Sequence, residues 1–135
     1  MLKAYVAAYG FSALALLVLD GVWLSLMGDR LYRPVLGDMM ATRVDLVAAV
    51  AFYLIFIFGV TWFATAPALR EASAIRAAVN GALLGFVAYA TYDLTNQATL
   101  TRWSSTITLA DMAWGTVLTT CAALAGYYGS RMVAS

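Results

Sequence analysis

The chain has 135 residues, of which 64% are hydrophobic and 11% are charged, and its formal net charge is +1. A soluble domain carries about 25% charged residues, so this chain has too few charges to cover a water-facing surface, and a lipid bilayer is its expected partner. The near-neutral charge excludes a nucleic-acid partner. Histidine is absent and Cys121 is the sole cysteine, which removes the usual ligands of haem, zinc and iron–sulfur clusters.

Four apolar runs predict the fold class, an all-α integral membrane four-helix bundle with short loops. Each run has the roughly 20 residues that a helix needs to cross a hydrocarbon layer of about 30 Å. Together they predict a single transmembrane domain over residues 1–135 with both termini on one side. The predicted spans are residues 4–28, 45–66, 76–97 and 106–130.

The connecting segments predict local features of the bundle. Residues 29–44 mix Arg and Asp with apolar side chains, which predicts a segment lying in the membrane interface, broken by Pro34 and Gly37. Pro67 is expected near the first turn of the third span. The spacing of Gly81 and Gly85 predicts close contact between helix backbones.

Basic side chains do not decide the orientation, because four lie on each side of the predicted bundle. The N-terminal amine adds one positive charge to the terminal side, which favours termini in the cytoplasm. The basic residues are Lys3, Arg70, Arg76 and Arg131 on the terminal side, and Arg30, Arg33, Arg43 and Arg102 on the other.

Four aspartates fall in the half of the bilayer that carries the loops at 29–44 and 98–105. Asp20 lies about 12 Å below that interface, at 1.5 Å per residue, and Asp93 lies near the end of the third span. Asp45 fits a capping box that begins at Thr42. Asp111 fits a similar box, unless its helix begins earlier, at residue 105 or 106, and leaves the acid inside.

Helix capping does not explain Asp20 or Asp93, because each lies towards the C-terminal end of its helix, where the helix dipole opposes a negative charge. An ionised Asp deep in a span costs about 2.5–3.5 kcal/mol on insertion scales. Three alternatives follow. The two groups are protonated and bond to a neighbouring helix, they meet an arginine from a loop, or they bind a ligand.

Helical spacing gathers aromatic side chains beside these acids. Asp20 shares a face with Trp23, Asp111 shares one with Trp114, and one face of the third span carries two tyrosines with Asp93. An acidic floor with aromatic walls is typical of a site for a cation, a polar small molecule or a lipid headgroup. The candidate ligand-binding residues are Asp20, Trp23, Tyr89, Tyr92, Asp93, Asn96, Asp111 and Trp114.

Three short stretches carry a family resemblance: "DGVWL" (20–24), "YDLTN" (92–96) and "DMAWG" (111–115). They resemble the predicted four-span bacterial membrane proteins classed as domain-of-unknown-function family 2177, over almost the whole chain. The resemblance implies a bacterial inner (cytoplasmic) membrane protein with four helices. It implies no activity, so no catalytic residue is carried over.

The leading hypothesis is a protein that binds or transports a small cationic or polar, lipid-like ligand, with proton coupling as one option. Transport through only four spans would need a homo-oligomer. The first alternative is a structural or assembly subunit of a larger membrane complex. The second is a membrane enzyme acting on a lipid or isoprenoid, against which stand the absence of histidine and of a DxxxD or DDxxD cluster. The sequence names no catalytic residue, cofactor or metal ligand.

Overall fold

The computed structural model describes all residues, 1–135, and contains helices and turns but no strand. Four of its helical segments are long and apolar enough to cross a membrane, so the predicted all-α, four-span fold class is confirmed. Two π-helical turns, Gly28–Tyr32 and Val60–Thr65, and one 3-10 turn, Gly37–Met39, lie between helices. The helices are α1 (Leu2–Met27), α2 (Arg33–Leu36), α3 (Leu46–Gly59), α4 (Ala66–Arg70), α5 (Ala74–Thr99) and α6 (Ser105–Ala134).

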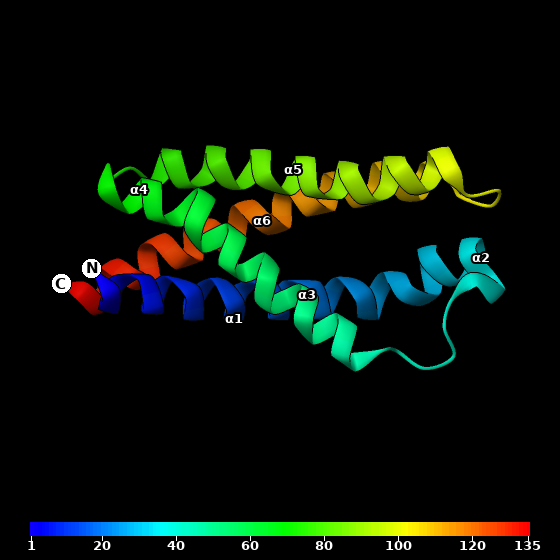
Figure 1. The fold of residues 1–135 in the computed structure, drawn as a ribbon, viewed down its shortest axis with the longest axis horizontal. Coiled ribbons are helices and arrows are strands. Elements are labelled where there is room, and N and C mark those ends of the chain that lie inside the picture. The colour runs from blue at the N-terminus through cyan, green and yellow to red at the C-terminus, as the bar shows by residue number, and fades with distance from the viewer.

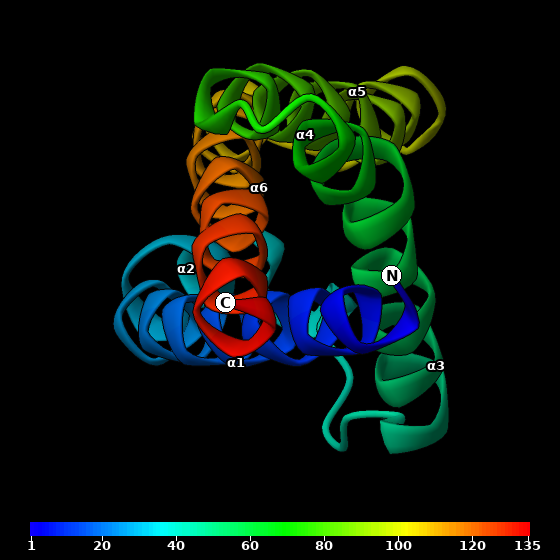
Figure 2. The ribbon, with the colours of Figure 1, turned by 90° about the vertical axis from the view of Figure 1, so that its left-hand side faces the viewer.

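Both termini lie at one end of the bundle, and α2 with the connection between α5 and α6 lies at the other (Figure 1). Helices α5 and α6 run antiparallel, whereas α3 crosses the bundle obliquely. In the end-on view, α6 lies between α1 and α5 (Figure 2). Helix α6 is therefore the central helix, and it packs extensively against both neighbours.

The outer surface of the bundle is apolar, and its interior is packed with small side chains. This pattern is typical of a protein surrounded by lipid. Large side chains such as Leu14, Ile55 and Leu83 are exposed. The buried positions are instead rich in small and hydroxylated residues, such as Ser12 and Ala122. In the absence of a hydrophobic driving force between helices, close contact of small residues is what holds such a bundle together.

Glycines let α5 and α6 approach closely. A Cβ added at Gly81 would lie 2.9 Å from the Ala123 Cβ, and one at Gly85 would lie 2.3 Å from the Gly115 carbonyl oxygen. A Cβ at Gly115 would lie 2.2 Å from the Tyr89 ring. The contact predicted from the glycine spacing is therefore present, and any larger residue would push the helices apart.

The prediction that Pro34 breaks the chain is wrong. Helix α1 continues through the π-helical turn Gly28–Tyr32 into α2, where Pro34 lies in the first turn. Proline has no N–H and its ring crowds the carbonyl four residues earlier, and the π-helical turn lies just before it, where a regular α-helix would be disturbed. The helix ends at Gly37, whose φ of +52° is a conformation that favours glycine.

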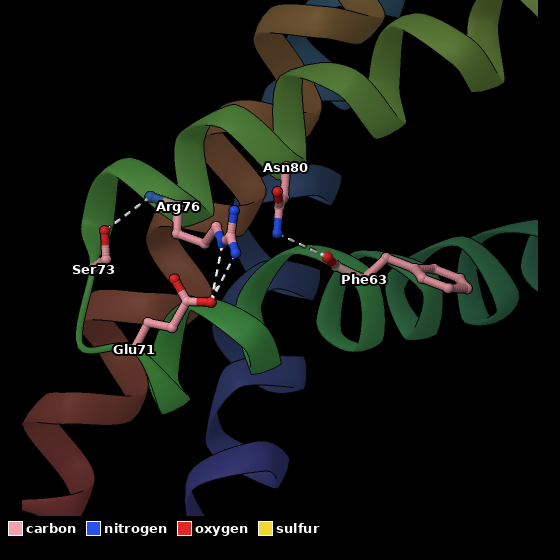
Figure 3. Close-up of polar contacts among 5 residues, drawn as sticks. All are labelled: Phe63, Glu71, Ser73, Arg76 and Asn80. Atoms are coloured by element: carbon pink, nitrogen blue, oxygen red, sulfur yellow. Dashed lines mark hydrogen bonds and ion pairs between the residues drawn. The ribbon is translucent and has the colours of Figure 1, made fainter.

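The second span also has a π-helical turn before a proline, Pro67, which was predicted to lie near the start of the third span. Pro67 instead lies in α4, where it extends the second span after the π-helical turn Val60–Thr65. The missing N–H leaves the Phe63 carbonyl without its usual partner. The Asn80 side chain of α5 donates to that carbonyl through Nδ2 at 3.2 Å (Figure 3). Asn80 thus supplies a hydrogen bond that the proline cannot.

The capping predictions have separate outcomes. Thr42 does not cap a helix; Asp45 is itself the N-cap of α3, and its Oδ1 accepts from the Ala48 N–H at 3.1 Å. Helix α6 begins after Ser104, whose hydroxyl accepts from the Thr106 N–H. The earlier start places Asp111 inside the helix, so the capping interpretation of Asp111 is excluded.

Candidate functional site

Asp20 joins three helices near the end of the bundle that carries α2. It is buried on α1, and its Oδ2 accepts a hydrogen bond from the Tyr53 hydroxyl of α3. Its Oδ1 accepts from Trp114 Nε1 of α6 at 3.2 Å. Both carboxyl oxygens therefore already have protein partners on neighbouring helices.

The two Asp-x-x-Trp motifs meet each other across the interface of α1 and α6. Trp23 and Trp114 stack with ring centroids 4.6 Å apart and planes within 6°. Trp23 Nε1 donates to the Tyr32 hydroxyl at 2.9 Å, and that hydroxyl donates to Asp111 Oδ1. The contacts are reciprocal. Trp114 of α6 donates directly to Asp20 of α1, and Trp23 of α1 is linked to Asp111 of α6 through the Tyr32 hydroxyl.

Asp93 lies opposite Asp111 in the interface of α5 and α6. Tyr89 meets Gly115 there, and one helical turn further along the antiparallel pair brings Asp93 against Asp111. The two carboxyl groups are direct neighbours. Asp93 is fully buried, and neither of its oxygens receives a hydrogen bond from an N–H or O–H donor of the protein.

No loop arginine reaches this pair. Arg33 is paired with Asp29 at 2.9 Å, and Arg102 is paired with Asp38 at 2.8 Å, all on exposed side chains. A buried carboxylate without a donor is strongly unfavourable. A proton held between Asp93 and Asp111 would give each carboxyl group a hydrogen-bond partner.

A cavity of about 310 Å³ lies in front of Asp111. Helix α3 supplies Phe52 and Phe56 to its walls, and α5 supplies Tyr89 and Tyr92. Phe52 and Tyr92 are each about half exposed, so the cavity opens sideways between α3 and α5. It therefore has one carboxyl group among aromatic walls and a mouth that faces the lipid.

The structure brings most of the predicted residues together, some in the wall of this cavity and others in the layer behind it. Three of them line it: Tyr89, Tyr92 and Asp111. Asp93 lies against Asp111, whereas Asp20, Trp23 and Trp114 form the hydrogen-bonded and stacked layer between α1 and α6. Asn96 lies one turn beyond Tyr92 on α5 and is half-buried.

Sequence reasoning missed four aromatic residues of the site, namely Tyr32, Tyr53, Phe52 and Phe56. Tyr32 lies in the segment that was expected to lie in the membrane interface, and the continuous helix keeps it beside Asp111. The other three lie in an aromatic-rich part of the second span. The strong hydrophobicity of that part predicted a membrane span and gave no separate indication of a site. A tyrosine within such a span was the available signal, because its hydroxyl needs a partner in lipid.

Carboxyl groups and aromatic ring faces are chemically able to attract a cation. No group of three or more Asp, Glu or Cys side chains lies close enough together to hold a metal ion. The aromatic faces and the carboxyl pair are instead suited to an ammonium group, which is attracted to both.

Four apolar spans around a buried polar cluster define a multi-pass helical membrane protein. Within that class, residues 5–128 match the family described as "Predicted membrane protein (DUF2177)". Because the match covers most of the chain, the protein belongs to this family. No curated protein and no solved structure matches the chain.

Proposed function

We propose that the protein binds a small organic cation with an apolar body in the cavity between α3 and α5. The observation that carries the proposal is the position of Asp111, a single carboxyl group at the floor of an aromatic cavity of about 310 Å³. A carboxylate attracts an ammonium group, and the faces of Phe and Tyr rings attract it further. The sideways mouth suits a ligand that arrives through the lipid.

The carboxyl pair supplies a coupling between the cation and a proton. Two adjacent carboxyl groups in apolar surroundings resist double ionisation. A cation bound at Asp111 would offset this resistance, so cation binding and proton release at the pair are coupled. Proton-coupled transport follows if the protein assembles as a homo-oligomer with a pathway between subunits.

The remaining parts of the proposal concern location. We place the protein in the bacterial inner membrane, as the resemblance of its motifs to the bacterial family implies, with its termini in the cytoplasm, as the N-terminal amine favours. In this orientation the cavity and the carboxyl pair lie in the outer half of the bilayer. The ligand would enter from that leaflet.

Binding of benzyltrimethylammonium to the detergent-purified protein tests the function. Its uncharged isostere, neopentylbenzene, controls for hydrophobic partitioning. The wild type is expected to bind the cation more tightly than the isostere. Asp111→Asn is expected to weaken cation binding about tenfold or more, because the ion pair between the carboxylate and the quaternary ammonium is lost. Equilibrium dialysis or calorimetry measures both affinities.

Asp38→Asn is the matched control, because Asp38 is an exposed carboxyl group of the connecting segment. It removes the same charge and is expected to leave the affinity unchanged. Equal affinity for the cation and the isostere would refute the proposal. An equal loss of cation affinity in the Asp111 and Asp38 variants would also refute it, because the net charge of the protein would then explain the effect.

A structural subunit is the second candidate, and one observation favours it. Both oxygens of Asp20 are bonded by side chains of neighbouring helices, as in a residue that only holds a bundle together. Failure of the wild type to bind any cation would leave this function as the better account.

A further inference from the structure

A second groove is lined by residues of α1, the second span and α4. Helix α4 and the two termini lie at the end of the bundle opposite to α2 (Figure 1). The volume of the groove is about 450 Å³, and it runs between α1 and the second span. Tyr5 and Tyr9 of α1 form one wall, and Phe58 and Trp62 form the other. The Tyr9 hydroxyl donates to the Leu54 carbonyl at 3.1 Å, which ties the two walls together.

The groove is amphipathic along its length. Phe58 and Trp62 stack with ring centroids 5.8 Å apart, and both are more than half exposed towards the lipid. Arg70, the last residue of α4, lines the same groove. The groove therefore has an apolar, aromatic body and a cation at the end where the membrane surface is expected.

The Arg70 guanidinium is not neutralised by the protein. It is exposed and forms neither an ion pair nor a hydrogen bond, in contrast to Arg76. The adjacent acid, Glu71, is already paired with Arg76 at 2.8 Å (Figure 3). The local positive charge is thus available to an anion from outside the chain.

We propose that this groove binds an anionic phospholipid, with the headgroup phosphate on Arg70 and an acyl chain between the tyrosines and Trp62. Arginine pairs well with phosphate oxygens, and aromatic side chains are favoured at the level of lipid headgroups. The apolar walls select a lipid over a free anion, since a soluble phosphate ester would gain nothing from them. The proposal is independent of cation binding, because the two sites lie at opposite ends of the bundle.

Native mass spectrometry of the intact protein in detergent micelles, titrated with dioleoyl phosphatidylglycerol or dioleoyl phosphatidylethanolamine, tests the proposal. The wild type is expected to bind the anionic lipid more tightly than the zwitterionic one. Arg70→Gln is expected to lower the affinity for phosphatidylglycerol about tenfold, the loss of one charge-assisted contact, and to lower that for phosphatidylethanolamine less, because the ammonium group of this lipid already offsets its phosphate charge. The exposed position of Arg70 makes misfolding of this variant unexpected.

Arg131→Gln is the matched control. Arg131 lies at the same end, but its guanidinium donates to the Tyr127 hydroxyl at 2.6 Å and does not line the groove. Retained binding in this variant supports the groove, whereas an equal loss in both variants would refute it in favour of diffuse surface charge. Unchanged lipid binding in Arg70→Gln, or binding of chain-free glycerophosphoglycerol as tight as that of the lipid, would also overturn the proposal.

Discussion

At the level of single residues, the same side chain has different surroundings at each aspartate of the spans. Asp45 caps α3, Asp20 accepts bonds from two other helices, and Asp111 faces a cavity. Asp93 is buried against Asp111 without any donor. Both oxygens of Asp20 accept bonds from the protein, Asp111 accepts one from Tyr32, and Asp93 accepts none. The number of protein donors, rather than the depth of the residue, thus distinguishes these buried carboxyl groups.

Substitutions at Asp20 separate its structural contacts from ligand binding. Asp20→Asn is expected to keep the wild-type fold and cation affinity, because the amide oxygen accepts from Trp114 and its NH₂ donates to the Tyr53 oxygen. Asp20→Leu leaves both partners unpaired and is expected to lower the free energy of unfolding by about 1–2 kcal/mol. Denaturant titration in detergent micelles measures the difference.

The outcomes at Asp20 are informative in both directions. A leucine variant as stable as the wild type would show that the three-helix contact contributes nothing. Loss of cation binding in a fully folded asparagine variant would instead make Asp20 part of the binding site, as its position beside Trp23 suggested in the sequence.

The residues of the site were only partly predictable from spacing. The i,i+3 relation of Asp20 and Trp23 and that of Asp111 and Trp114 place each pair on one face of its helix. Spacing within one helix does not reveal the partner on another, and the reciprocal contact through Tyr32 depends on how α1 crosses α6. Tyr53 was missed for the same reason.

At the level of helices, hydrophobicity identified the four spans because a backbone in lipid must satisfy its own hydrogen bonds. It could not locate where the helices end. Pro34 and Pro67 were expected to break or begin helices, but π-helical turns before them keep the chain helical. Those turns follow from the local geometry of proline and from a partner such as Asn80 on another helix, and neither is visible in a hydropathy pattern.

The packing of α5 on α6 was more predictable, because it depends on the size of the residues. A glycine every fourth residue allows close approach, and Gly81 and Gly85 do meet the backbone of α6. This register also fixes the site, since it brings Asp93 opposite Asp111. The small residues therefore position the carboxyl pair although they contact no ligand themselves.

At the level of the whole molecule, the proposed orientation is testable with a single thiol. In a Cys121→Ser background, Ser135→Cys carries the sole cysteine at the end of α6. Termini in the cytoplasm predict that a membrane-impermeant maleimide labels this thiol in inside-out vesicles but not in intact spheroplasts. Labelling of spheroplasts would reverse the orientation and place the cavity in the inner leaflet.

The whole-molecule account has one central claim, that the cavity in front of Asp111 is a cation site. The most direct measurement is anomalous X-ray scattering from crystals of the protein soaked with 4-bromobenzyltrimethylammonium. The claim predicts a bromine peak in the cavity between α3 and α5, with the ammonium group within about 6 Å of the aromatic ring centres and next to the Asp111 carboxyl group. An empty cavity at a saturating probe concentration, or a bromine peak confined to another surface, would contradict it.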